Sequence, residues 1–76
     1  MNEKRRKCLR DAISHLDMAA TIIECAAAEE QTAHDALPDV FQYGDQGEKM
    51  EAAVSNLEQA VELINEASQY VSESID

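Results

Sequence analysis

The residues best suited to acid–base or metal chemistry stand close together before the middle of the chain. Glu30 and His34 are four positions apart, so a helix would place both on one face, and Asp35 follows directly. Imidazole and carboxylate groups bind zinc, but a zinc site needs three or four ligands, and no further His or Cys stands nearby at ligand spacing. We interpret the group as a helix-surface cluster that supports its helix, and we expect no metal ion and no cofactor.

Other candidates for catalysis lack the partners that their chemistry requires. The neighbouring carboxylates are Glu29 with Glu30, and Glu48 with Glu51. Acid–base work would need a nearly uncharged cleft to shift their pKa values, and the sequence implies none. Cys8 and Cys25 have neither a Cys-x-x-Cys spacing nor an arranged histidine. We therefore expect no catalytic residues and a protein that is not an enzyme.

Five of the six cationic residues crowd the first turns of the chain: Lys4, Arg5, Arg6, Lys7 and Arg10. The dipole of a helix opposes positive charge at its start, so something should compensate. One explanation is neutralisation by acids at the end of a second, antiparallel helix. Those acids are Glu66, Glu73 and Asp76. The other is that the cluster, brought together across an oligomer, binds an anionic nucleotide-type ligand through Lys4, Arg6 and Arg10.

The net charge of −10 disfavours some partners and favours others. Binding of duplex nucleic acid is disfavoured, because phosphate contacts need lysine and arginine. The simplest interpretation of the acidic surface is that it keeps a small helical protein in solution. An acidic face for a basic partner and a mimic of nucleic acid are the sharper alternatives.

The sequence also indicates in which cellular compartment the protein is expected. No apolar run is long enough to span a bilayer or to act as a signal peptide, so we expect no membrane contact. Cys8 and Cys25 would lie on one helix, roughly 25 Å apart along its axis, which is too far for a disulfide bond. Unpaired cysteines are typical of a reducing compartment, so we expect a cytoplasmic protein.

Apolar residues recur at helical spacing over residues 4–36 and again over residues 46–74, which predicts two long helices. The inward row of the first helix comprises Leu9, Ile13, Leu16, Ala20, Ile23 and Ala27. The inward row of the second comprises Met50, Val54, Leu57, Val61, Ile64, Ser68, Val71 and Ile75. Beside each row runs a companion stripe: Ala12, Ala19, Ile22, Ala26 and Ala33 in the first helix, and Ala53, Ala60, Leu63, Ala67 and Tyr70 in the second. The first row weakens after Ala27, where Glu30 and His34 occupy its next positions.

Residues 37–45 form the expected connector. Pro38 disfavours helix at the residue before it, so the first helix should end near Ala36. A proline also suits the first position of a new helical turn. We expect one short turn over residues 39–42, with Phe41 pointing inward.

The start of the second helix has its own signals. Gly44 can adopt positive φ and break the short turn. Asp45 is a good N-cap, and Glu48 three residues later completes a pattern like a capping box. The polar and aromatic content of this region is more than a turn requires. Its candidate binding residues are Phe41, Gln42, Tyr43, Gln46 and Glu48.

Two long helices and a short connector predict an all-α, single-domain protein over residues 1–76, folded as an antiparallel two-helix hairpin. One hairpin cannot cover both the inward row and the companion stripe of each helix. The companion stripes therefore stay exposed unless another chain covers them. We predict a homo-oligomeric helical bundle, for which a dimer is the simplest form and a higher oligomer remains open.

A distinctive pattern surrounds the connector: Leu37-Pro38-Asp39, Gln42, Gly47-Glu48 and Met50-Glu51, followed by Ala53, Leu57, Glu58 and Ala60. It resembles that of a group of small two-helix proteins encoded by Firmicutes and by their phages and prophages. Their usual form reads Leu-Pro-Glu-x-Leu-Gln-x-Ser-x-Arg-Gly-Glu-x-Met-Glu. The likeness covers residues 33–63. This chain departs from it at Gly44, where serine is usual, and at Gln46, where arginine is usual.

The resemblance implies a small protein of phage type and brings no catalytic activity with it. We therefore expect a non-enzymatic helical oligomer that binds and sequesters or inhibits a host target. The target would be a defence protein or a nucleotide signal, and the connector and the basic N-terminus would form the site. The alternative is a structural or assembly adaptor without a ligand, whose connector only turns the chain.

Overall fold

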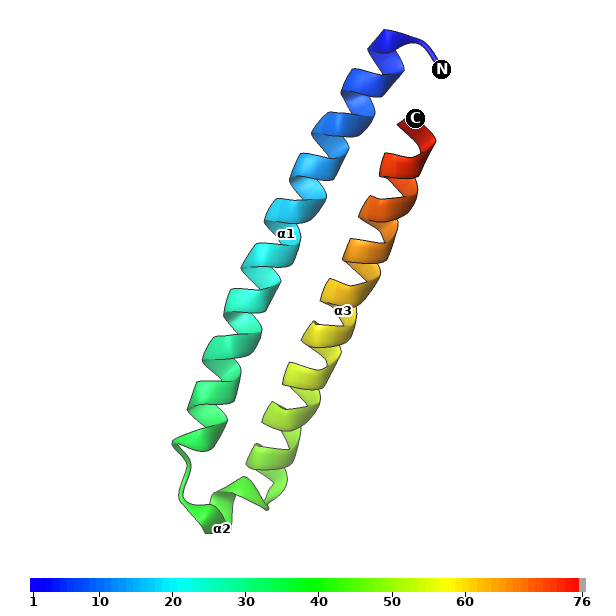
Figure 1. Ribbon diagram of the computed structural model, residues 1–76. Coiled ribbons are helices and arrows are strands. Elements are labelled where there is room, and N and C mark those ends of the chain that lie inside the picture. The colour runs from blue at the N-terminus through cyan, green and yellow to red at the C-terminus, as the bar shows by residue number, and fades with distance from the viewer. Residues whose placement is uncertain (76) are drawn as a thin grey trace.

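The computed structural model describes residues 1–75 and is helical throughout, apart from short turns and the first two residues. The helices are α1 (Glu3–Asp35), α2 (Asp39–Gln42) and α3 (Asp45–Ile75). The predicted all-α class is therefore confirmed. Figure 1 shows α1 and α3 side by side, with both chain ends at one end of the molecule and α2 at the other. The result is a rod with extents of 58 × 14 × 12 Å.

Contacts between α1 and α3 follow the inward rows. The most buried apolar side chains are Ala20 and Ala27 of α1 and Val54 and Val61 of α3, each with at most 8% of its surface exposed. The other predicted core residues are half-buried: Leu9, Ile13, Leu16, Ile23, Met50, Leu57, Ile64 and Val71. The core is thus a single layer of side chains between two helices.

The N-terminus of α1 is capped by Asn2. The Oδ1 atom of Asn2 accepts a hydrogen bond from the backbone N–H of Arg5 over 2.9 Å, which satisfies one of the free donors of the first turn. At the other end, α1 stops at Asp35, one residue before the predicted end. The side chain of Gln42 returns to this end and donates from Nε2 to the carbonyl oxygens of Leu37 (2.7 Å) and Asp35 (3.3 Å).

Three expectations for the connector are wrong. Phe41 does not point inward: 55% of its surface is exposed, because the α2 turn directs it away from the ends of α1 and α3. Gly44 does not adopt positive φ. Instead its carbonyl oxygen accepts the backbone N–H of Glu48 over 3.0 Å, so Gly44 occupies the N-cap position that we predicted for Asp45. Helix α3 begins at Asp45 itself.

The tight connector depends on Gly47, which is buried in the first turn of α3. A Cβ atom at this position would overlap the backbone carbonyl of Gln42. The absence of a side chain therefore lets α3 start directly against the end of α2.

We predict that Gly47→Ala lowers the free energy of unfolding by about 2 kcal/mol, because the backbone around Gln42 must move to admit the methyl group. Urea denaturation followed by circular dichroism measures this change. An unchanged midpoint would show that the close approach is not needed.

Gly44→Ser is the matched control in the same connector. A Cβ atom there would meet its nearest backbone atoms at an ordinary 3.6 and 3.7 Å. Serine is also a better N-cap residue than glycine, and it restricts the unfolded chain more. We expect this variant to be more stable than the wild type by about 0.5 kcal/mol.

Candidate functional site

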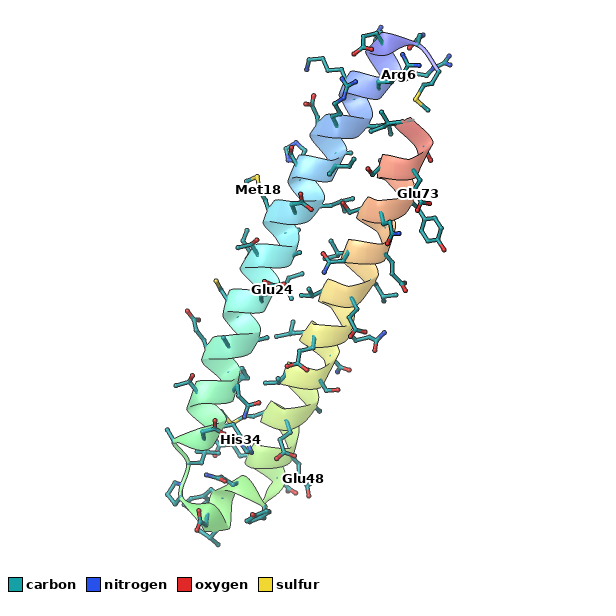
Figure 2. The ribbon with its side chains drawn as sticks, viewed as in Figure 1. Arg6, Met18, Glu24, His34, Glu48 and Glu73 are labelled. Carbon is teal, nitrogen blue, oxygen red and sulfur yellow. The ribbon has the colours of Figure 1, made fainter. Side chains whose placement is uncertain are left out.

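His34 links the two long helices near the connector. Among residues 1–75 it is the polar residue that is buried, with 7% of its surface exposed. The prediction that His34 lies on the helix surface is therefore wrong. Its Nδ1 atom lies 3.3 Å from Oδ1 of Asp35 in α1, and its Nε2 atom lies 3.1 Å from Oε1 of Glu51 in α3. Figure 2 shows it at the connector end of the helix pair. The row position after Ala27 and Glu30 explains its burial, because a helical period of about 3.5 residues brings position 34 inward.

The two contacts of His34 differ in kind. Nε2 lies close to the Glu51 carboxylate but forms no hydrogen bond with it, so the contact becomes an ion pair only when the ring is protonated. A neutral imidazole carries one N–H, whereas the protonated ring donates from both nitrogens. Both carboxylates are mostly exposed, at 65% for the Asp35 side chain and 62% for that of Glu51. The arrangement acts as a clamp between α1 and α3.

The electrostatics of the clamp do not suit acid catalysis. The hydrogen bond with His34, and then that with Gln31, holds the pKa of Asp35 below its ordinary value of 3.8. A carboxyl group with a lowered pKa stays ionised at neutral pH and has no proton to give. Glu30 lies one turn earlier in the inward row and is half-buried. Among residues 1–75 no three His, Cys, Asp or Glu side chains are grouped to hold a metal ion.

The connector exposes three large side chains, which we call the tip: Val40, Phe41 and Tyr43. The exposed fractions are 75% for Val40, 55% for Phe41 and 82% for Tyr43. Three acids lie close to the tip in the sequence, Asp39, Asp45 and Glu48, and all three are exposed. Of the predicted binding residues, Gln46 is exposed, whereas Gln42 is half-buried and occupied in capping α1. The tip therefore offers large apolar side chains that the chain itself does not use.

Three of the five cations in the basic cluster pair with two acids of their own helix. Nη1 of Arg10 lies 3.0 Å from Glu3, Nη1 of Arg6 lies 3.5 Å from the same carboxylate, and Nζ of Lys7 lies 3.1 Å from Asp11. All of these pairs are exposed or partly exposed, so each stabilises the fold by about 0–1 kcal/mol. Compensation for the helix dipole comes from nearby acids in α1.

The acids expected to neutralise the cluster from α3 do not do so in residues 1–75. Glu66 and Glu73 form no ion pair with it there. Figure 2 shows Arg6 and Glu73 at the same end of the molecule but on different helices. Asp76 lies outside the described residues. Lys4 is exposed and takes part in none of the ion pairs of the described chain.

Comparison with known proteins adds no family. No protein-family model, curated protein or solved structure matches the chain. No helix within residues 1–75 combines the length and the apolar character needed to cross a membrane.

We predict that His34→Leu unfolds at a higher urea concentration than His34→Ala, and at no lower a concentration than the wild type. Leucine fills the buried row position, and both carboxylates are exposed enough for water to replace the imidazole. His34→Ala leaves a gap and should lose about 1–2 kcal/mol. A leucine variant less stable than the alanine variant would show that the clamp contributes more than packing does.

The lowered pKa of Asp35 predicts a small acid-dependent loss of stability. The unfolded state binds this proton more readily than the folded state, so the contribution is present above pH 3.8 and disappears as the pH falls through the folded pKa. Asp35→Asn should therefore flatten the decline in unfolding free energy below pH 3.8, as measured by urea titrations at a series of pH values. Parallel declines for the two proteins would contradict the assignment.

Proposed function

We propose that this protein is a non-enzymatic binding protein that captures a protein target through the tip of its connector. The observation that carries the proposal is the exposure of Val40, Phe41 and Tyr43 together on one short turn. Aromatic side chains are enriched in protein interfaces, and they supply much of the binding energy there. A monomeric protein without a partner has no need to expose them together.

The tip is also held in place before any target binds. Gln42 ties it to the end of α1, and Gly47 lets α3 close against it. A rigid turn loses little conformational entropy on binding, which favours affinity. The exposed carboxylates of Asp39, Asp45 and Glu48 suit a target with a basic surface around an apolar pocket.

A protein target is favoured over an anionic nucleotide. Two of the three side chains expected to bind the anion, Arg6 and Arg10, already contact the carboxylate of Glu3. An incoming phosphate would have to displace that carboxylate or bind beside a negative charge. A protein target that binds at the tip would not have to displace such a carboxylate.

The resemblance of residues 33–63 to small proteins of Firmicutes phages supports a target in the bacterial host cytoplasm. A stoichiometric inhibitor of a host defence protein is the form of the proposal that this resemblance favours. We further propose that the helix pair is an antiparallel hairpin that works as the unit of a homo-oligomer. The single-layer core supports this, because a chain of 76 residues with so few buried side chains gains little stability alone.

The test compares the wild type with the double variant Phe41→Ala, Tyr43→Ala as bait in a lysate of a Firmicutes host. A protein captured by the wild type is then purified, and its dissociation constant is measured by calorimetry for both baits. We expect the double variant to bind at least about 100-fold more weakly, since truncated aromatic anchors typically cost 2 kcal/mol or more each. The unfolding free energy should change by less than about 0.5 kcal/mol, because both side chains are exposed.

Met18→Ala is the matched control, because Met18 is also exposed but lies on the far side of α1 (Figure 2). It should bind like the wild type. Equal capture by the tip variant would overturn the assignment of the site. Nucleotide binding by the wild type in native mass spectrometry, without protein capture, would favour the anionic ligand instead.

A further inference from the structure

The helix pair has two unlike sides. On one side, Ala27, Ala28 and Val61 line a shallow groove. Its polar lining residues are Glu24 and Gln31 of α1 and Glu58 of α3. Each of these polar residues directly follows a residue of an inward row. In an antiparallel pair, positions that follow the row share one side and positions that precede it share the other. The companion stripes precede the row, so both lie on the side opposite the groove.

This second side is apolar and exposed. We call it the companion face, after the companion stripes that form it; Ala19 lies at the middle of α1 and Ala60 at the middle of α3. Three large side chains on it are open to solvent: Ile22 at 67%, Leu63 at 55% and Tyr70 at 72%. The alanines between them let another helix approach closely. The face runs along both long helices.

The chain exposes more surface than a compact monomer of its mass, by about the area that one partner would bury. The chain exposes 5616 Å², whereas a compact monomer of 8.4 kDa exposes about 4,600 Å². The excess of about 1,000 Å² is close to the area, about 800 Å², that each partner buries in an interface of standard size. If one partner covered the companion face, this excess exposed area would be buried.

Charge along the companion face is asymmetric. Arg5 lies seven residues before Ala12, which places it on this face at the N-terminal end. Glu29 lies between Ala26 and Ala33, on the same face toward the connector. Residues 29–51 as a whole carry seven acids and one lysine. Two copies side by side in parallel would bring these acidic regions together, whereas an antiparallel pair separates them.

We propose that the partner on the companion face is a second copy of the chain, packed antiparallel about a two-fold axis, with Arg5 of each copy beside Glu29 of the other. This inference rests on the oligomer in the proposed function and adds its geometry. The midpoint between Arg5 and Glu29 along α1 is residue 17, about 3 Å from the middle of that helix at residue 19. The pairing therefore overlaps the two rods over nearly their whole length.

The test exchanges the charges of Arg5 and Glu29 and measures the dimer dissociation constant by sedimentation equilibrium. Arg5→Glu and Glu29→Arg should each raise the dimer dissociation constant by about fivefold or more, because the pair occurs twice in a two-fold dimer. The double variant should return to within about threefold of the wild type. Arg5 and Glu29 lie about 36 Å apart on one helix, so such a rescue acts between chains.

Lys7→Glu is the control. It makes the same change in net charge as Arg5→Glu, but Lys7 is paired with Asp11, away from the companion face. It should affect dimerisation much less. A double variant no better than the worse single variant would overturn the antiparallel pairing.

A distance measurement tests the orientation independently. A spin label on Cys8, in a Cys25→Ser background, should give a separation of about 27 Å or more in the antiparallel dimer and about 10–15 Å in a parallel one. A short distance overturns the orientation but leaves the oligomer. A monomer in sedimentation overturns the dimer, whereas target capture by the tip is judged separately by the bait experiment.

Discussion

The structure depends on one constraint: two helices in contact can bury only a narrow row of side chains from each. The rows that meet along α1 and α3 are made of small and medium residues, with Ala20 and Ala27 facing a row that includes Val54 and Val61. Most other side chains are at least partly exposed, including three large apolar residues of the companion face and three on the connector tip. The exposed residues are therefore where function and assembly must be sought.

The sequence predicted the helices well, because periodicity over some thirty residues leaves few alternatives. The predicted inward rows contain the most buried apolar side chains of residues 1–75, those of Ala20, Ala27, Val54 and Val61. It failed at His34, where residue type was weighed above the row position that actually buries the side chain. It failed again at Phe41, because one four-residue turn contains too little periodicity to tell which way a side chain points. The role of Gly47 depends on the backbone of Gln42, which no local pattern reveals.

Charge is distributed unevenly between the two ends of the molecule. Arg6, Lys7 and Arg10 of the first turns pair with Glu3 and Asp11 of the same helix. Lys4 and Arg5 form no ion pair within residues 1–75. The acids near the connector have fewer local counterparts, apart from His34 and Lys49. This unmatched negative charge distinguishes the connector end, and it is available both to a basic target and to the cationic end of another copy.

The two long helices are covalently joined at one end only, and this determines how they can separate. Opening of the helix pair must begin at the end where both termini lie, because the connector ties the helices together at the other (Figure 1). The clamp of His34, the cap from Gln42 and the close approach at Gly47 all add to the connector end. Backbone amides should thus exchange fastest near the termini and become progressively more protected toward the connector. Proteases would enter at the end where the termini lie, leaving the tip as the last part to lose its shape.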